Sequence, residues 1–252
     1  MKVSLISPER NEKGCLEELA ERVSAVMQKR FGAGQWEYII VDDASDDGSD
    51  EKLRQLAKKY PNLRPFFHAQ RKGQTGCFQT GFDAAKGDFV ITMDADLQHS
   101  PEDLPLFFEK IGQGFELVNA NRKKKQHPFL IKLASKAYNA LMRIFFNCPV
   151  ADAASNFTAI KASYVKSLHL VDNDHRYIIP IVMKRGLRKI AEVEVMLKGR
   201  KAGKSKYSAM PKYARGFPEL FAAFLRISSG RYDFPNEKAV AKRGKEKKPV
   251  NR

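Results

Sequence analysis

Short apolar runs alternate with longer amphipathic segments along the first half of the chain. The apolar runs are bounded by polar and turn-forming residues, and they predict strands at 2–7, 36–41, 63–68, 88–93 and 115–119. Between these runs, apolar positions at helical spacing predict helices at 14–31, 49–60, 75–85 and 101–111. Strands that alternate with helices are typical of parallel sheets with crossover helices. The pattern therefore predicts an α/β fold with a mostly parallel sheet and flanking helices.

The pattern changes in the second half. Apolar positions interleaved with basic residues predict an amphipathic helix at 129–146, and shorter apolar runs predict strands at 156–160 and 189–195. A second amphipathic helix is predicted from a stripe at helical spacing, made of Phe217, Leu220, Phe221, Phe224 and Leu225. The polar, basic end of the chain is typical of a disordered tail. We expect three parts: one α/β domain at 1–210, an interfacial helix at 211–230 and a tail at 231–252.

Composition and charge limit the classes of function. With 43% hydrophobic and 29% charged residues, the chain has the composition of a soluble globular protein. It has no run near the roughly 20 apolar residues of a membrane span and no recognisable signal peptide, so we expect the cytoplasmic side. Three cysteines without C-x-x-C spacing favour reduced thiols. The net charge of +16 indicates a polyanionic partner, either nucleic acid, an anionic membrane or a substrate that carries phosphate.

Two carboxylates, Asp94 and Asp96, end the fourth predicted strand. Residues i and i+2 of an extended segment project to the same side, so both side chains can reach one cation. Paired carboxylates suit a hard divalent ion such as Mg2+ or Mn2+. A second acidic turn, with Asp42 and Asp43, follows the second strand. Because ligands bind outside the carboxyl ends of parallel strands, we expect both acidic turns at one edge of the sheet.

A glycine-rich turn precedes the third predicted helix. Its glycines, Gly73 and Gly76, would let backbone N–H groups approach a diphosphate closely, and Arg71 in the same turn is a further donor-site candidate. The first predicted strand is followed by three further candidates, Pro8, Asn11 and Glu12.

Together these motifs resemble those of the nucleotide-sugar glycosyltransferases of family 2, which have a GT-A fold, and the resemblance covers roughly residues 1–210. It implies a donor site in which the nucleobase lies against Pro8, Asn11 and Glu12. It also implies that Asp42 and Asp43 contact the base and ribose of the donor, and that the glycine-rich turn takes part in donor binding. The metal that bridges the donor diphosphate would be held by Asp94 and Asp96, with Ala95 between them and Gln98 beside them. Arg10 departs from the family, which usually has Tyr or another uncharged residue there.

Motifs in the second half narrow the resemblance to the polyprenyl-phosphate sugar transferases, whose members make dolichyl-phosphate mannose or undecaprenyl-phosphate glucose. The similar segments are 94–102, 152–157, 192–195 and 203–207, together with Arg200. The resemblance implies that donor or acceptor phosphate is bound by Arg200, Ser205, Lys206 and Tyr207. It also places Asp152 near the acceptor. The Gln-x-x-Arg-Trp element of processive polysaccharide synthases is absent from the sequence.

The chemistry of a phosphate acceptor agrees with this resemblance. A sugar hydroxyl needs a positioned base, whereas a lipid monophosphate, with a second pKa of about 6, is largely dianionic at neutral pH. It needs orientation and charge neutralisation, for which the candidates are Arg122, Lys132, Ser135, Arg200 and Lys206. We therefore treat His99 and His175 as loop or packing residues. The residues expected to act in catalysis are Asp96, Arg122, Asp152 and Arg200.

The sequence thus predicts metal-dependent, inverting transfer of a sugar from a nucleoside diphosphate to a polyprenyl phosphate, by a peripheral protein on an anionic membrane surface. A small membrane-anchoring subunit is a further candidate partner. One alternative is a family 2 transferase that acts on a glycan or lipopolysaccharide hydroxyl. Another is a basic nucleic-acid-binding protein, which explains the charge but leaves the acidic turns unexplained. A sugar-nucleotide pyrophosphorylase is disfavoured because the N-terminal glycine-rich loop of such enzymes is missing.

Overall fold

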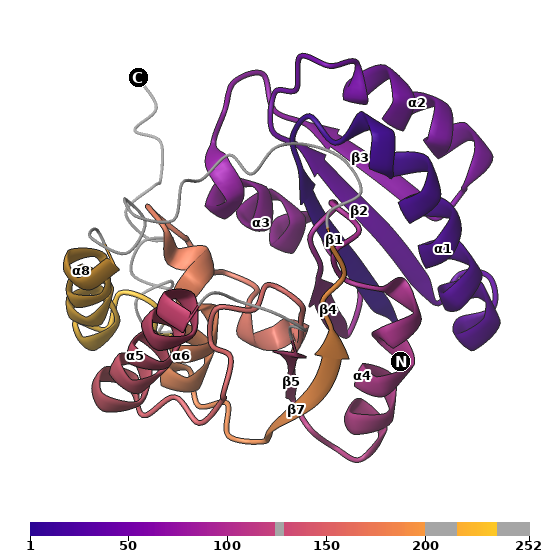
Figure 1. The fold of residues 1–252 in the computed structure, drawn as a ribbon. Helices are drawn as coiled ribbons and strands as arrows, with labels where there is room; N and C mark the ends of the chain where they lie inside the picture. Colours follow the sequence, from indigo (N-terminus) through magenta and orange to yellow (C-terminus); the bar gives the residue numbers. More distant parts are fainter. Residues whose placement is uncertain (124–128, 200–215, 236–252) are drawn as a thin grey trace, which may run out of the picture.

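The computed structural model describes residues 1–123, 129–199 and 216–235 (Figure 1). It contains a seven-stranded sheet in the order β3-β2-β1-β4-β6-β5-β7. The strands are β1 Val3–Glu9, β2 Trp36–Asp42, β3 Leu63–Phe67, β4 Phe89–Thr92, β5 Leu117–Lys123, β6 Thr158–Lys161 and β7 Ile190–Met196. The helices are α1 Lys13–Phe31, α2 Ser49–Lys59, α3 Gly73–Ala84, α4 Leu104–Gly112, α5 Phe129–Phe146, α6 Ile178–Lys184 and α8 Gly216–Ser228. Short 3-10 turns are η1 Pro101–Asp103, η2 Ala162–Tyr164 and η3 Asp174–Tyr177.

The sheet is mostly parallel, as the alternation of strands and helices predicts. Strands β3, β2, β1 and β4 run parallel to one another, and β5 pairs in parallel with β7. Strand β6 is antiparallel to both of its neighbours, β4 and β5. Because β1, β2 and β4 all point the same way, the loops that follow them meet at one edge of the sheet. This edge carries both acidic turns.

Helices cover both faces of the sheet (Figure 1). On one face, Leu5 and Ile40 share a core with apolar side chains of α1, α2 and α4. On the other face, Ile6 and Ile39 share a core with side chains of α3, α5, α6 and α8. Successive residues of a strand project to opposite faces, so each central strand contributes to both cores. That double burial explains why these strands read as continuous apolar runs.

Every element that the sequence predicts is present, with small shifts at its ends. The short helix α6 was not predicted, because its residues Ile178 to Val182 are all buried and show no polar side at helical spacing. The 3-10 turn η3 was not predicted either. The last described helix, α8, packs against α6 and η3.

The C-terminal helix α8 divides its apolar stripe between the domain and solvent. Leu220 and Ile227 are buried, whereas Phe221 and Leu225 are about half exposed, at 45% and 53%. Beyond the helix, Tyr232 is 1% exposed and donates a hydrogen bond to Asp174 in η3. Tyr232 thus packs against η3, although it lies within the segment from residue 231 onward that was expected to form the tail. Among the helices that the structure describes, none is long and apolar enough to cross a membrane.

Candidate active site

The first acidic turn follows β2 and is tied to the loop after β1. The backbone N–H of Ser45 donates to Oδ1 of Asp42 at 3.1 Å, and the Ser45 hydroxyl bridges Asp42 and Glu9. The side-chain amide of Asn11 donates to Asp46 at 2.6 Å, and the N–H of Asp46 donates back to Asn11 at 3.0 Å. The predicted donor-site residues Asn11 and Asp42 thus lie in one hydrogen-bonded cluster.

Glu9 belongs to this cluster, although the sequence did not single it out. Its side chain is buried between the turn and the sheet, with the residue 3% exposed. Burial, reinforced by the neighbouring carboxylate of Asp42, raises the pKa of Glu9 from 4.5 to about 9. A carboxyl with this pKa is neutral at physiological pH. It can therefore lie beside Asp42 without charge repulsion.

Asp43 joins this turn to the glycine-rich turn before α3. Its carboxylate accepts hydrogen bonds from the N–H groups of Lys72 and Gly73, at 2.7 and 2.9 Å, and lies 3.0 Å from Nδ1 of His68. Burial opposes ionisation, but these donors outweigh it and hold the pKa of Asp43 below its usual value. Gly73 has a φ of 70°, and a Cβ at Gly76 would lie 2.4 Å from Cβ of Lys72. Both glycines are therefore required by the tightness of the turn.

The second acidic turn follows β4 at the same edge. Oδ1 of Asp94 accepts hydrogen bonds from the side-chain amides of Gln74 at 3.0 Å and Asn156 at 3.3 Å. Oδ1 of Asp96 accepts from the N–H of Gln98 at 3.1 Å. Leu97, between them, has a φ of 59°, a conformation that is rare for a bulky residue and marks a constrained turn. The two carboxylates are thus held by amide donors from three separate segments.

Gln98 connects this turn to the segment after β7. The N–H of Lys198 donates to the carbonyl of Gln98 at 2.9 Å, and the Gln98 amide lies 3.5 Å from the Lys198 carbonyl. The described part of the chain therefore reaches the second acidic turn just before residue 200. Four predicted phosphate-binding residues lie outside the described residues: Arg200, Ser205, Lys206 and Tyr207. The side chain of Lys132 is also outside them, while Ser135 is exposed on α5 and Arg71 is exposed before α3.

Arg122 and Asp152, predicted separately, form one ion pair. Nε of Arg122 lies 2.6 Å from Oδ2 of Asp152, and Nη2 lies 2.8 Å from Oδ1, so the contact is bidentate. Both side chains are largely buried, at 18% and 15% exposure. The side-chain amide of Asn119 on β5 fixes the loop by donating to the carbonyl of Asp152 at 2.9 Å. Asp94 also acts on Arg122 through its charge, which ties the pair to the acidic edge.

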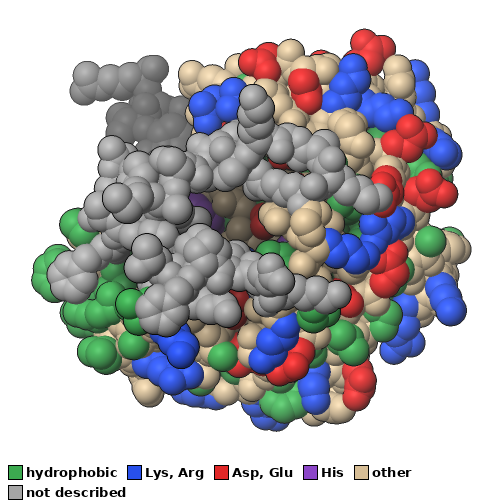
Figure 2. Space-filling model, in the orientation of Figure 1, with side chains coloured by type: hydrophobic (Ala, Val, Ile, Leu, Met, Phe, Trp, Pro, Cys, Tyr) green, Lys and Arg blue, Asp and Glu red, His purple; other side chains and the backbone are tan. Residues whose placement is uncertain are grey.

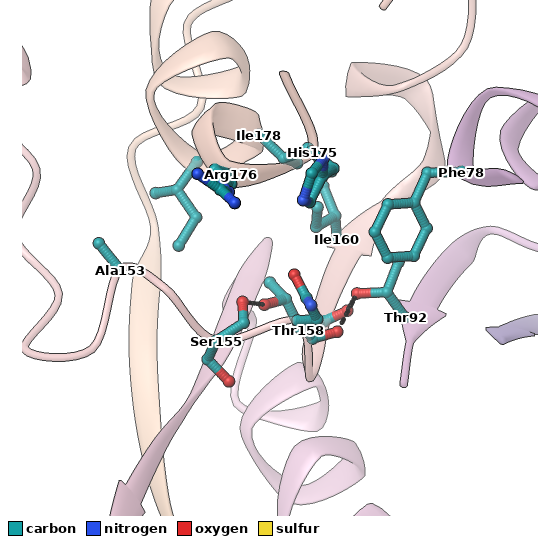
Figure 3. Close-up of a pocket in the computed structure, with 11 residues that line it drawn as sticks. Phe78, Thr92, Ala153, Ser155, Thr158, Ile160, His175, Arg176 and Ile178 are labelled. Carbon is teal, nitrogen blue, oxygen red and sulfur yellow. Dashed lines mark hydrogen bonds between the residues drawn. The ribbon is translucent and has the colours of Figure 1, made fainter. Parts of the chain in front are cut away.

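A small cavity of about 10 Å³, roughly the size that holds one water molecule, lies between α3, β6 and η3 (Figure 3). Its walls come from α3, β4, β6, η3, α6 and the loop before β6, and they include Phe78, Thr92, Asn156, Thr158, His175 and Arg176. Asn156 lines the cavity and also donates to Asp94. The cavity is too small for a sugar, but it joins the acidic edge to η3.

Three buried side chains near the first acidic turn, Asp43, His68 and Cys77, offer ligand atoms within 4.8 Å of one another. They do not suit Mg2+ or Mn2+, which prefer oxygen ligands. Both ring nitrogens of His68 have hydrogen-bonding partners, Asp43 and Thr80, and burial followed by nearby carboxylates raises the pKa of the Cys77 thiol. These side chains form a hydrogen-bonded support for the turn. Carboxylate oxygens, such as those that Asp94 and Asp96 offer, suit a hard cation better.

Several residues of this edge were not among the sequence candidates: Glu9, His68, Gln74 and Asn156. Glu9 lies between the candidates Pro8 and Asn11, and Gln74 lies inside the glycine-rich turn, so a closer reading of both segments would have included them. Asn156 lies in a segment that the resemblance covered. His68 carries no signal beyond its position at the end of a strand.

Comparison with known proteins places these features in context. The pattern of the family described as Glycosyl transferase family 2 matches residues 4–168. An undecaprenyl-phosphate 4-deoxy-4-formamido-L-arabinose transferase of Pectobacterium atrosepticum is 35% identical over 207 residues, which cover 82% of this chain and 62% of that protein. A dolichol-phosphate mannosyltransferase of Pyrococcus furiosus is 33% identical over 213 residues, which cover 82% and 59%. The chain thus spans about three fifths of the length of these curated relatives.

Solved structures support the predicted fold. Glucosyl-3-phosphoglycerate synthase from Mycobacterium tuberculosis, crystallised with Mn2+, UDP and its product, aligns with a TM-score of 0.66 over 94% of this chain and 81% of that one. The same enzyme was also crystallised with Mg2+ and UDP, again with a TM-score of 0.66. Sequence identity is 18% and 17%, so these likenesses concern the fold alone. They confirm the predicted GT-A architecture.

Proposed function

The chain belongs to glycosyl transferase family 2, and from this premise we propose that it transfers a sugar from a nucleoside diphosphate to a polyprenyl monophosphate, with Mg2+ or Mn2+ as cofactor. The observation that carries the proposal is the shared edge of the sheet. There the two acidic turns lie at the ends of β2 and β4, and the charge of Asp94 acts on the Arg122–Asp152 pair at the end of β5. Carboxylates for a metal and a cation for phosphate thus meet at one place.

The donor half of the site lies between β1, β2 and β4. Asn11, Asp42 and Asp43 lie in the cluster where the nucleoside would bind, and the N-terminal turn of α3 faces the same edge. Asp94 and Asp96 would hold the divalent cation, whose charge would stabilise the leaving diphosphate. Carboxylate oxygens at a strand end suit such an ion. Arg200, Ser205, Lys206 and Tyr207 remain proposed ligands of phosphate from the segment that follows Gly199.

The acceptor half lies around Arg122, and its electrostatics favour a phosphate over a hydroxyl acceptor. Asp152 is the carboxylate that could serve as a general base there, but both of its oxygens are bound by the Arg122 guanidinium. A carboxylate whose two oxygens are both directed at a guanidinium is not presented to an acceptor hydroxyl. A dianionic phosphate needs no base and gains from the nearby cation. We therefore assign Asp152 to positioning Arg122, while Arg122 with Lys132 and Ser135 orients the lipid phosphate.

The proposed membrane contact uses the exposed apolar side chains of α5 and α8. Leu133 and Ile144 on α5 are 54% and 75% exposed, and Phe221 and Leu225 on α8 are similarly exposed. Figure 2 shows hydrophobic side chains gathered at this end of the molecule. Lys136 and Arg143 on α5 are exposed as well. Apolar side chains beside cations are typical of helices that lie in the interface of an anionic membrane.

A binding experiment tests the donor half before any substrate is identified. We expect UDP or GDP to raise the Tm of the protein in the presence of Mn2+ and to lose most of this effect in EDTA, because metal and nucleotide bind together. Asp96→Ala should remove the Mn2+-dependent part, whereas Asp50→Ala, at an exposed position on α2, should keep it. A larger shift with RNA than with either nucleotide would instead favour the nucleic-acid-binding alternative.

A further inference from the structure

The first turn of α3 contacts both acidic turns. The N–H groups of Lys72 and Gly73 bind Asp43, and the side chain of the next residue, Gln74, donates to Asp94 at 3.0 Å. The position of this single turn therefore sets the geometry between the two acidic turns.

The third contact of the same turn is His175. Oγ1 of Thr75, which directly follows Gln74, lies 2.8 Å from Nδ1 of His175. Thr75 is 5% exposed, so this hydrogen bond is shielded from water. The imidazole also contacts the ring of Phe78, one turn later on α3, with ring centroids 6.4 Å apart. His175 thus holds α3 at two positions on the side that faces the cavity. Figure 3 shows it across the cavity from Ser155 and Thr158.

The neighbours of His175 are anchored on both sides. Asp174, 1% exposed, accepts hydrogen bonds from Tyr232 and from Nη2 of Arg226 at 2.8 Å. Arg176 pairs with Glu219 of α8 at 2.9 Å. With η3 fixed to α8 in this way, the backbone of His175 has little freedom to follow a moving α3. It is therefore a fixed point against which the first turn of α3 is held.

We propose that His175 is a positioning residue of the donor site: through Thr75 it fixes the first turn of α3, and so keeps the Gln74 amide on Asp94. The inference rests on the proposed function, because it assigns Asp94 to the metal. The sequence alone suggested that His175 is a loop or packing residue. The inference gives it an additional role in positioning. Asn156 also donates to Asp94, so loss of the His175 contact should weaken metal binding without abolishing it.

The geometry allows a matched pair of substitutions. In His175→Asn the side-chain amide can reach the place of Nδ1, while in His175→Gln it extends toward the place of Nε2. We expect His175→Asn to bind Mn2+, in the presence of UDP or GDP, about as tightly as the unaltered protein. His175→Gln should bind it about threefold to tenfold more weakly, the effect of losing one hydrogen bond. Free Mn2+ can be measured by electron paramagnetic resonance, without any turnover.

A second pair keeps the test valid if His175 variants fold poorly. Thr75→Ser retains the hydroxyl and should retain Mn2+ affinity, whereas the isosteric Thr75→Val should lose affinity as His175→Gln does. Gln74→Met should have a similar effect, and combining it with Thr75→Val should add little, because both act through one contact to Asp94. Equal affinities for Thr75→Ser and Thr75→Val, or fully additive losses in the double variant, would overturn the inference alone. Unchanged Mn2+ affinity in Asp94→Ala would overturn the metal assignment and the inference with it.

Discussion

At the residue scale, the pairing of Arg122 with Asp152 decides what each can do. A bidentate contact directs both carboxylate oxygens at the guanidinium and fixes the plane of the guanidinium. The pair lies at the carboxyl end of β5, beside the acidic edge. Two residues that the sequence presented as separate candidates therefore form one unit.

A double-mutant cycle separates the two possible roles of Asp152. We expect Arg122→Ala to lower kcat about a hundredfold or more, the usual effect of losing a preorganised charge. Asp152→Ala should lower kcat about tenfold, because Arg122 loses its orientation. The double variant should be no slower than Arg122→Ala, since Asp152 acts only through Arg122. If the two losses multiply, Asp152 contributes independently and a base-assisted transfer to a hydroxyl becomes the better account.

Glu9 gives a prediction about pH. Its pKa is about 9 in the folded protein and near 4.5 when exposed, so the folded state keeps a proton that the unfolded state loses. The contribution of this proton to the free energy of unfolding is fully present below about pH 4.5 and is lost as the pH rises through about 9. Glu9→Gln stays neutral, so its advantage in unfolding free energy over the unaltered protein should grow across that window. The growth should not exceed about 1.4 kcal/mol per pH unit.

Urea unfolding of both proteins across this pH range measures the difference. The comparison between the two proteins removes the contribution of other titrating groups. If the unfolding free energies of the two proteins change with pH in parallel, Glu9 is ionised in the folded state.

The sequence singled out the carboxylates of the candidate site but not the groups that hydrogen-bond to them. Asp42, Asp43, Asp94 and Asp96 were evident because a carboxylate directly after a buried apolar strand rarely contributes to core packing. Gln74 and Asn156 are neutral amides, and Asn156 reaches Asp94 only because β6 inserts next to β4. Such contacts depend on strand order, which the apolar pattern does not encode.

At the element scale, α8 belongs to the domain on one side and is open on the other. The periodic stripe predicted the helix, but periodicity cannot say which apolar residues face the protein and which face a membrane. The same limit applies to β6, since its pattern predicts a strand without giving its direction. Ion pairs join α8 to η3. Because the paired residues are far apart in the sequence, no local pattern predicts these contacts.

Two leucines on α8 separate packing from docking. Leu220 is 1% exposed, so Leu220→Ala should lower the free energy of unfolding by about 2–4 kcal/mol through lost burial and a residual cavity. Leu225 is 53% exposed, so Leu225→Ala should change it by less than about 0.5 kcal/mol. Cosedimentation with vesicles should show the opposite order, with weaker binding for Leu225→Ala. Unchanged vesicle binding in Leu225→Ala, and in Phe221→Ala, would argue against a membrane contact through this helix.

At the scale of the whole molecule, a charge of +16 coexists with a strongly acidic edge. We assign these to different partners: the acidic edge to the metal and donor, and the surrounding cations to phosphate and to an anionic membrane surface. Attraction between exposed charges is screened by salt. We therefore expect the protein to bind anionic vesicles at low ionic strength, to release them in high salt, and to bind neutral vesicles poorly. Binding that is independent of both salt and lipid charge would contradict this assignment.

The most direct test of the proposed activity is transfer of a labelled sugar into lipid. The full chain is incubated with Mn2+, a polyprenyl phosphate and a panel of labelled UDP- and GDP-sugars, and the mixture is then extracted with organic solvent. We expect label in the organic phase with at least one donor, at a level that EDTA or Asp96→Ala abolishes while Asp50→Ala preserves it. Label that enters only a water-soluble glycan, or transfer to lipid that persists in EDTA and in Asp96→Ala, would contradict the proposal.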